Sequence, residues 1–66
     1  MSNSIIRIEL SMSDRLLWVW TDDETIFPKL IGIKGVMDII QNANRYTLLL
    51  AEGYSAIAIQ KIIENF

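Results

Sequence analysis

The chain opens with an alternation of apolar and polar residues over positions 5–12. Successive side chains of a β-strand point to opposite faces, so this period of two predicts a strand with one buried face and one largely polar face. The expected buried side consists of Ile6, Ile8, Leu10 and Met12, and the expected outer side consists of Ile5, Arg7, Glu9 and Ser11.

The second predicted strand is the run Leu16-Leu17-Trp18-Val19-Trp20, which follows a turn signal at Ser13-Asp14-Arg15. Aromatic and β-branched residues favour a strand that pairs with the first one as a hairpin. A helix capped by Ser13 fits less well, because consecutive large apolar residues exceed the width of a helix stripe. Leu16, Trp18 and Trp20 share one face, but alternation alone does not decide whether that face is buried. Either way, one apolar face of this strand needs covering.

A short helix is predicted over residues 26–33, after an acidic loop. Thr25 or Asp23 can cap it, and Pro28 falls in the first turn, where its missing N–H costs nothing. Gly32 is a typical residue at the end of such a helix.

Residues 36–43 allow two interpretations. As a helix, the segment would bury Val36, Ile39, Ile40 and Ala43 at spacings of three and four. As a strand, it would turn back through Asn42-Ala43-Asn44, since Asn is a favoured turn residue. Periodicity favours the helix and the turn signal favours the strand, so both stay open here.

The last part of the chain predicts a strand followed by an amphipathic helix. Residues 46–51 are apolar on both faces, which is typical of a strand inside a sheet. Ser55 is placed to cap the final helix. The apolar stripe of that helix consists of Ile59, Ile62, Ile63 and Phe66. Together these elements predict a single α+β domain over residues 1–66, a small two-layer sandwich with an N-terminal hairpin and a C-terminal helix.

Composition narrows the candidate chemistry. The 66 residues contain no cysteine and no histidine, the commonest ligands of zinc and the commonest general base. The acidic run Asp22-Asp23-Glu24 lacks the spacing of a dedicated cation site and is expected to be a solvated loop. No catalytic, metal-binding or cofactor-binding residues are therefore predicted, and the expected class is a non-enzymatic protein.

Charge and hydrophobicity bear on location and partners. Residues 1–4 lack the basic start of a signal peptide, and no run of apolar residues is long enough to span a membrane, so a cytoplasmic protein that does not enter membranes is expected. The net charge of −2 disfavours a phosphate-rich partner, although a local basic patch remains compatible with it.

Two resemblances involve the glycines of the middle segment. The run Leu30-Ile31-Gly32-Ile33-Lys34-Gly35-Val36-Met37-Asp38-Ile39-Ile40 resembles the signature of KH domains. In that family a Gly-x-x-Gly loop clamps a single nucleic-acid strand, which would assign binding to Gly32, Ile33, Lys34 and Gly35. The resemblance also requires a helix over residues 36–43.

The order of a helix, a Gly-Val turn, a hairpin and a helix also looks like the ferredoxin-like fold, as found in heavy-metal-associated domains. The Cys-x-x-Cys of those domains is absent, so their metal function is not implied.

The favoured function is a protein-interaction or regulatory module. A domain of 66 residues with 52% hydrophobic residues has more apolar surface than a small core can hide, which predicts a homodimer or a subunit of a complex. The expected contact residues are Leu16, Trp18 and Trp20, because two aromatic side chains beside a charged rim are typical of an interface.

Overall fold

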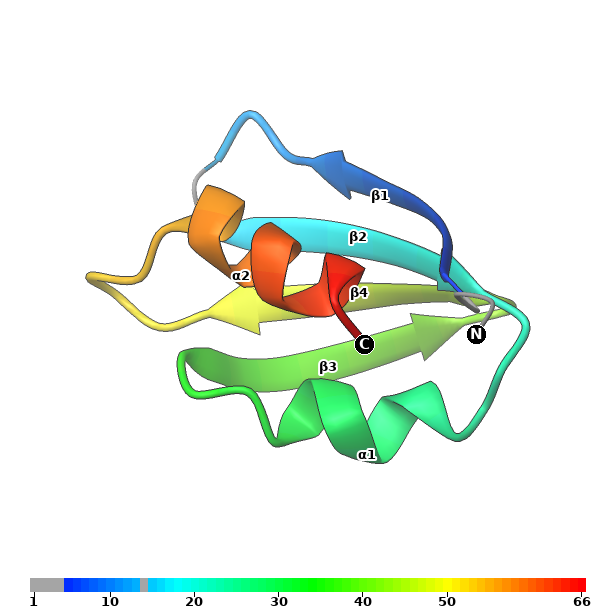
Figure 1. Ribbon diagram of the computed structural model, residues 1–66. Helices are drawn as coiled ribbons and strands as arrows, with labels where there is room; N and C mark the ends of the chain where they lie inside the picture. Colours follow the sequence, from blue (N-terminus) through cyan, green and yellow to red (C-terminus); the bar gives the residue numbers. More distant parts are fainter. Residues whose placement is uncertain (1–4, 14) are drawn as a thin grey trace.

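Four strands and two helices form the protein, as a computed structural model shows for residues 5–13 and 15–66, with the side chain of Ile6 left out (Figure 1). Expectations for residues 1–4, for Asp14 and for the side chain of Ile6 lie outside the described residues. The elements are β1 (Ile5–Leu10), β2 (Leu16–Thr21), α1 (Ile26–Ile31), β3 (Val36–Asn42), β4 (Arg45–Leu50) and α2 (Ala56–Glu64). The predicted α+β class is confirmed.

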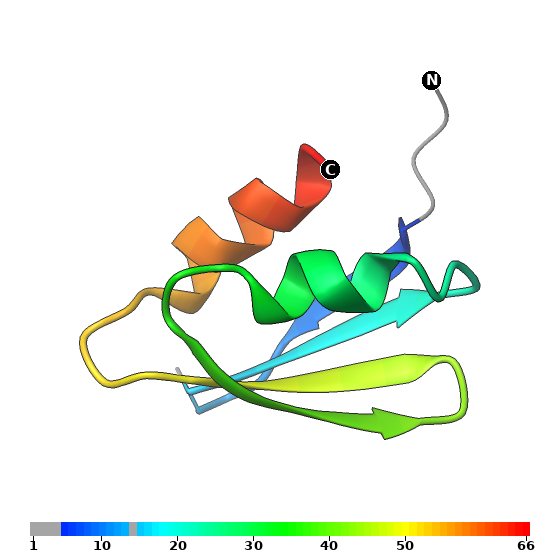
Figure 2. The same cartoon turned by 90° about the horizontal axis from the view of Figure 1, so that it is seen from below.

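The strands form one antiparallel sheet in the order β1-β2-β4-β3. Both helices lie on the same side of this sheet (Figure 2). Helix α1 covers β3, and α2 covers β1 and β2. The molecule therefore has two layers, and the second face of the sheet has no helix over it.

The core lies between the sheet and the helices. In both central strands every second residue is buried, starting with Leu17 in β2 and with Tyr46 in β4. The predicted central position of the last strand is confirmed. The buried apolar side chains are Leu17, Val19, Ile26, Leu30, Ile33, Tyr46, Leu48, Leu50, Ala56, Ile59 and Ile63.

Three positions differ from the expected pattern of buried residues, and one of them is Leu10, which was expected to be buried but is 42% exposed. A bulge between Ile5 and Arg7 shifts the register of β1, so that Ile5 pairs with Thr21 and packs against the core instead of lying on the polar side. Met12, expected to be buried, lies beyond the end of β1 and is fully exposed. Local alternation does not reveal a bulge, because the extra residue is set by pairing with the next strand.

The stripe of α2 is narrower than predicted. Ile59 and Ile63 are buried, and Phe66 packs partly against the core, but Ile62 is 46% exposed. The buried stripe turns instead toward Ala56 at the start of the helix. A short helix over a small sheet contacts the core along only one narrow line, so the fourth apolar position is left outside.

Residues 36–42 form β3, so the helix considered for this segment is wrong. The hairpin to β4 turns at Ala43, whose φ of 58° lies in the left-handed region. Tertiary pairing decides this case, since Ile39 and Ile40 pair with Leu48 and Thr47 of β4. The structure therefore lacks the helix that a KH-like arrangement requires.

The chain repeats one ββα unit, although no repeat is visible in the sequence. The hairpin β1–β2 with α1 and the hairpin β3–β4 with α2 meet through the antiparallel pair β2–β4. Each outer strand also carries a bulge at an equivalent place. In β1 it follows Ile5, which pairs with Thr21 at the end of β2, and in β3 it follows Val36, which pairs with Leu50 at the end of β4. The ferredoxin-like order places a strand after each helix, whereas here α2 is the last element, so that arrangement is not established.

The start of α2 gives a first testable prediction. The Ser55 hydroxyl accepts a hydrogen bond from the backbone N–H of Ala58, as predicted for a cap, whereas Thr25 at the start of α1 makes no such bond. Ser55→Ala is expected to lower the free energy of unfolding by about 1 kcal/mol. Thr25→Ala is the control: it removes no capping bond, only an exposed hydrogen bond from its hydroxyl to the Asp23 carboxylate, and should cost less in the same urea titration. Equal losses would contradict a capping role for Ser55.

Candidate functional site

The face of the sheet opposite the helices is the strongest candidate for a functional surface, and we refer to it as the open face. Paired residues of neighbouring strands share a face, so the register defines its members. They are Arg7 and Glu9 of β1, Leu16, Trp18 and Trp20 of β2, Arg45, Thr47 and Leu49 of β4, and Asp38, Ile40 and Asn42 of β3.

The tertiary structure decides the question that alternation left open. Leu17 and Val19 are fully buried under the helices, whereas Leu16, Trp18 and Trp20 are only half-buried. All three predicted contact residues therefore lie together on the open face. Their neighbours in β4 continue the apolar surface, because Leu16 pairs with Leu49.

Two arginines flank Trp20 along one row of the open face. Arg7 pairs with Trp20 on one side, and Arg45 pairs with it on the other. The guanidinium carbon of Arg7 lies 5.2 Å from the centre of a Trp20 ring, within the range of a cation–π contact. Within the described residues, the buried Nε atom of Arg45 has no hydrogen-bond partner. Its donor is thus unsatisfied in the isolated chain.

The charges at the rim of the open face balance one another. Arg7 forms an ion pair with Glu9 of the same strand. On the opposite half of the open face, Asp38 belongs to β3 and Arg45 to β4. Two cations and two anions surround an apolar centre, so the face as a whole carries no net charge. Such a surface, with large apolar side chains inside a polar rim, matches the anatomy of protein interfaces.

Comparison of the two ββα units shows which positions the fold itself constrains. Counting back from the last residues of β2 and β4, Val19 corresponds to Leu48, and both are buried. On the open face, however, Trp18 corresponds to Thr47 and Trp20 to Leu49. The shared architecture requires apolar residues only on the helix side. The repeated architecture alone therefore does not account for tryptophans at positions 18 and 20.

The loop from Gly32 to Gly35 does not form an open cradle. Gly32 caps α1, and the side chain of Ile33 is part of the core. Gly35 has a φ of 106°, and a Cβ atom there would lie 2.5 Å from the ring of Tyr54. Lys34 is the exposed side chain of this loop. The glycine at position 35 is thus explained by backbone conformation and by a close approach within the protein.

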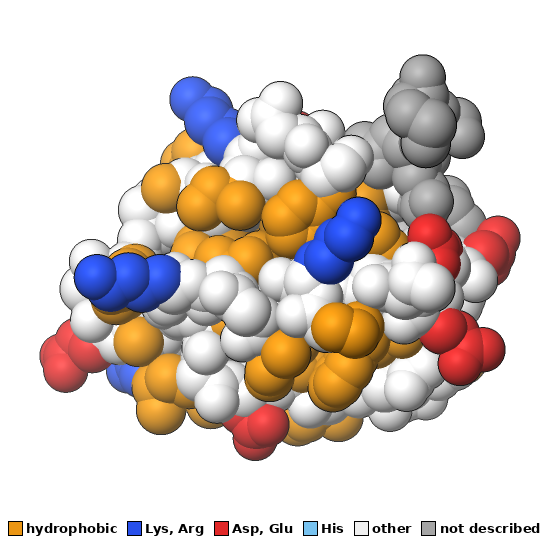
Figure 3. Space-filling model, turned by 60° about the horizontal axis from the view of Figure 1, so that its bottom comes forward, with side chains coloured by type: hydrophobic (Ala, Val, Ile, Leu, Met, Phe, Trp, Pro, Cys, Tyr) orange, Lys and Arg blue, Asp and Glu red, His pale blue; other side chains and the backbone are white. Residues whose placement is uncertain are grey.

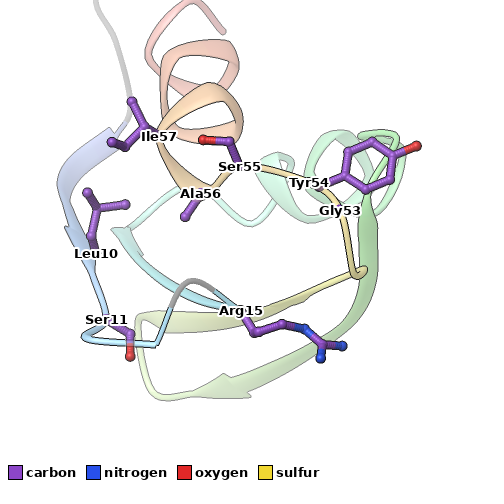
Figure 4. A pocket seen from close by; sticks show the side chains of 8 residues that line it. All are labelled: Leu10, Ser11, Arg15, Gly53, Tyr54, Ser55, Ala56 and Ile57. Atoms are coloured by element: carbon purple, nitrogen blue, oxygen red, sulfur yellow. The ribbon is translucent and has the colours of Figure 1, made fainter.

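A cavity of about 510 Å³ lies at one end of the molecule, next to the loop before α2 (Figure 4). Leu10 and Ile57 line one side of it, and Tyr54 lies on the other. Arg15 is the charged residue of its lining, and its Nε donates to the backbone carbonyl of Leu50 at 3.2 Å. Among the described residues, the lining holds no carboxylate that could work with Arg15 in acid–base chemistry. This cavity is lined by Leu10, Ser11, Arg15, Gly53, Tyr54, Ser55, Ala56 and Ile57.

The two helices also expose large apolar side chains, namely Phe27, Ile31, Ile57 and Ile62. Figure 3 shows orange groups on this side, with Lys or Arg side chains and polar atoms between some of them. Lys29 lies 5.9 Å from the ring centre of Phe66 and covers part of it. Single exposed apolar residues such as Ile57 and Ile31 are normal for a protein surface.

In the acidic loop before α1, the carboxylate of Asp23 finds its hydrogen-bond donors within the loop. The carboxylate of Asp23 accepts hydrogen bonds from the N–H of Thr25 at 2.9 Å and from its hydroxyl at 2.6 Å. Among the described residues, no three acidic side chains come close enough to hold a metal ion. This geometry explains the loop as a turn that leads into α1.

Sequence reasoning found the β2 part of the open face and missed its continuation. Arg45, Thr47 and Leu49 join it through pairing with β2, and Ile40 joins it through β3. The apolar content on both faces of β4 was the available signal for Leu49. Nothing local indicated Arg45 or Ile40, because their positions depend on strand register.

No protein-family model, curated protein or solved structure matches this chain. Within the described residues, no helix is both long and apolar enough to cross a membrane.

Proposed function

We propose that this chain is a non-enzymatic interaction module that binds a protein partner through its open face. The observation that carries the proposal is the placement of Trp18 and Trp20, half-buried, on the face of the sheet that no helix covers. Tryptophan and arginine dominate the energetics of protein interfaces because they bury large areas in well-packed pockets. Self-association and a cytoplasmic location stay predictions.

The edges of the sheet are weaker candidates than its open face. Both edge strands carry a bulge, between Ile5 and Arg7 in β1 and between Val36 and Asp38 in β3. A bulge interrupts the regular row of backbone donors and acceptors, which discourages the addition of a further strand. This supports contact through side chains of the face over backbone pairing at an edge.

Photo-crosslinking tests the proposal. A benzophenone amino acid at position 47 replaces Thr47, which pairs with Trp18 in the middle of the open face. The matched control carries it at Lys61, which is exposed on α2. In cells that produce the chain, irradiation is expected to give one discrete protein adduct from position 47 and none from position 61. Absence of an adduct at position 47, or the same adducts from both positions, would overturn the proposal.

A further inference from the structure

We infer that the protein partner of the open face is a second copy of this chain, packed sheet against sheet about a two-fold axis parallel to the strands. This inference rests on the proposed function and names its partner. Sheets that pack face to face align within about 30° and enclose a core about 10 Å thick. A second copy would thus bury the apolar centre of the open face in a new hydrophobic core between the two sheets.

The register of the sheet makes the open face self-complementary about this axis. The axis exchanges left and right across the sheet and keeps the position along the strands. Trp20 and Arg45 pair across β2 and β4 and so lie at the same height along the strands. The axis therefore places Trp20 of one copy opposite Arg45 of the other. Leu16 likewise meets the second copy's Leu49. Each contact occurs twice, which is the property of a two-fold interface.

The charged residues favour the same arrangement. About an axis parallel to the strands, Glu9 faces Ile40 of the other copy, since these residues pair with Trp18 and Thr47 respectively. A perpendicular axis through the row of Glu9 and Trp18 would instead place Glu9 opposite its own copy, and like charges in contact are unfavourable. The balanced rim also gives two copies no net repulsion, whereas a nucleic acid would need a surplus of cations.

Arg45 gains a partner in this arrangement. Opposite the indole of the second copy's Trp20, the guanidinium would take part in a cation–π contact. Arg7 already makes such a contact with Trp20 within one copy, so each Trp20 would lie between two cationic groups.

The size of the open face suffices for a specific dimer. Four strands spaced about 4.8 Å apart, with about six residues at about 3.4 Å each, form a face of roughly 20 by 20 Å. Because side chains roughen that area, two such faces would bury on the order of 1,000 Å² in total, where specific interfaces begin. The single copy exposes 4391 Å² at 7.6 kDa. Folded monomers of this mass expose about 4,300 Å², so a single copy is as compact as an ordinary monomer.

Sedimentation equilibrium of the purified chain tests the inference first. A monomer–dimer equilibrium is expected below about 1 mM. A monomer throughout that range would overturn the second copy as partner. An adduct of twice the chain mass from position 47 would support it. An adduct with a different protein would overturn this inference while leaving the proposed function intact.

A pair of variants at Ile40 then tests the arrangement. Ile40 is 62% exposed, so either charge is compatible with folding, and thermal melting followed by circular dichroism verifies this. Ile40→Glu would face Glu9 of the second copy and should weaken the dimer about tenfold relative to Ile40→Lys. Within one copy, β1 and β3 are opposite edges of the sheet, so Glu9 can act on position 40 only across the dimer.

The same pair in a Glu9→Gln background is the control. Removing the charge of Glu9 should bring the dissociation constants of the two Ile40 variants together. Equal weakening by Glu and Lys in the presence of Glu9 would contradict the axis parallel to the strands. Glu9→Gln also leaves Arg7 without its ion-pair partner, so only a difference of the same sign, with Ile40→Glu still the weaker dimer, would contradict the arrangement after this change.

Discussion

Leu17→Ala is expected to lower the free energy of unfolding by about 3 kcal/mol. Leu17 is fully buried between the sheet and the helices, so truncation removes contacts and leaves a cavity. A domain of 66 residues has a total stability of roughly 3–10 kcal/mol, so the variant should lose about a third or more of it. Urea denaturation followed by circular dichroism measures the loss.

Leu16→Ala is the matched control, one residue away on the open face. The same atoms are removed there from a half-buried position, so the expected cost in a single copy is about 1 kcal/mol or less. The comparison is made at low protein concentration, because association would add to apparent stability. A greater loss from Leu16→Ala than from Leu17→Ala would show that the open face had been assigned to the wrong side of β2.

Gly35→Ala is expected to destabilise the protein by about 2–3 kcal/mol, through two effects. The φ of 106° at Gly35 is strained for any residue with a side chain. The new Cβ atom would also approach the Cγ atom of Tyr54 to 2.7 Å, at the base of the ring, so the whole ring must move. Chemical denaturation of the variant measures the sum of both costs.

Gly53→Ala separates the two effects. Gly53 also has a positive φ, of 90°, but a Cβ atom at this position would have no other atom within 4 Å, so only backbone strain remains, of about 1 kcal/mol. Adding Tyr54→Ala to Gly35→Ala should recover part of the steric cost, and the thermodynamic cycle of the single and double variants measures that coupling. If Gly35→Ala and Gly53→Ala cost the same, the packing of Tyr54 over Gly35 plays no role.

Elements with local signals were predictable from the sequence. The alternation of β2, the cap at Ser55 and the Pro28–Gly32 spacing of α1 all depend on neighbouring residues. Residues 36–42 show the limit of such reasoning, because their spacing suits a helix and only pairing with β4 makes them a strand. Likewise the bulge at Ile5 has no local signature.

The candidate site was predictable in part, for the same reason. Because side chains alternate along a strand, the sequence alone determined that Leu16, Trp18 and Trp20 share one face and that this strand has two apolar faces. Only the tertiary structure decided that the helices cover Leu17 and Val19 and leave the tryptophans on the open face. Which face is buried depends on where distant helices pack, and no pattern within the strand contains that information.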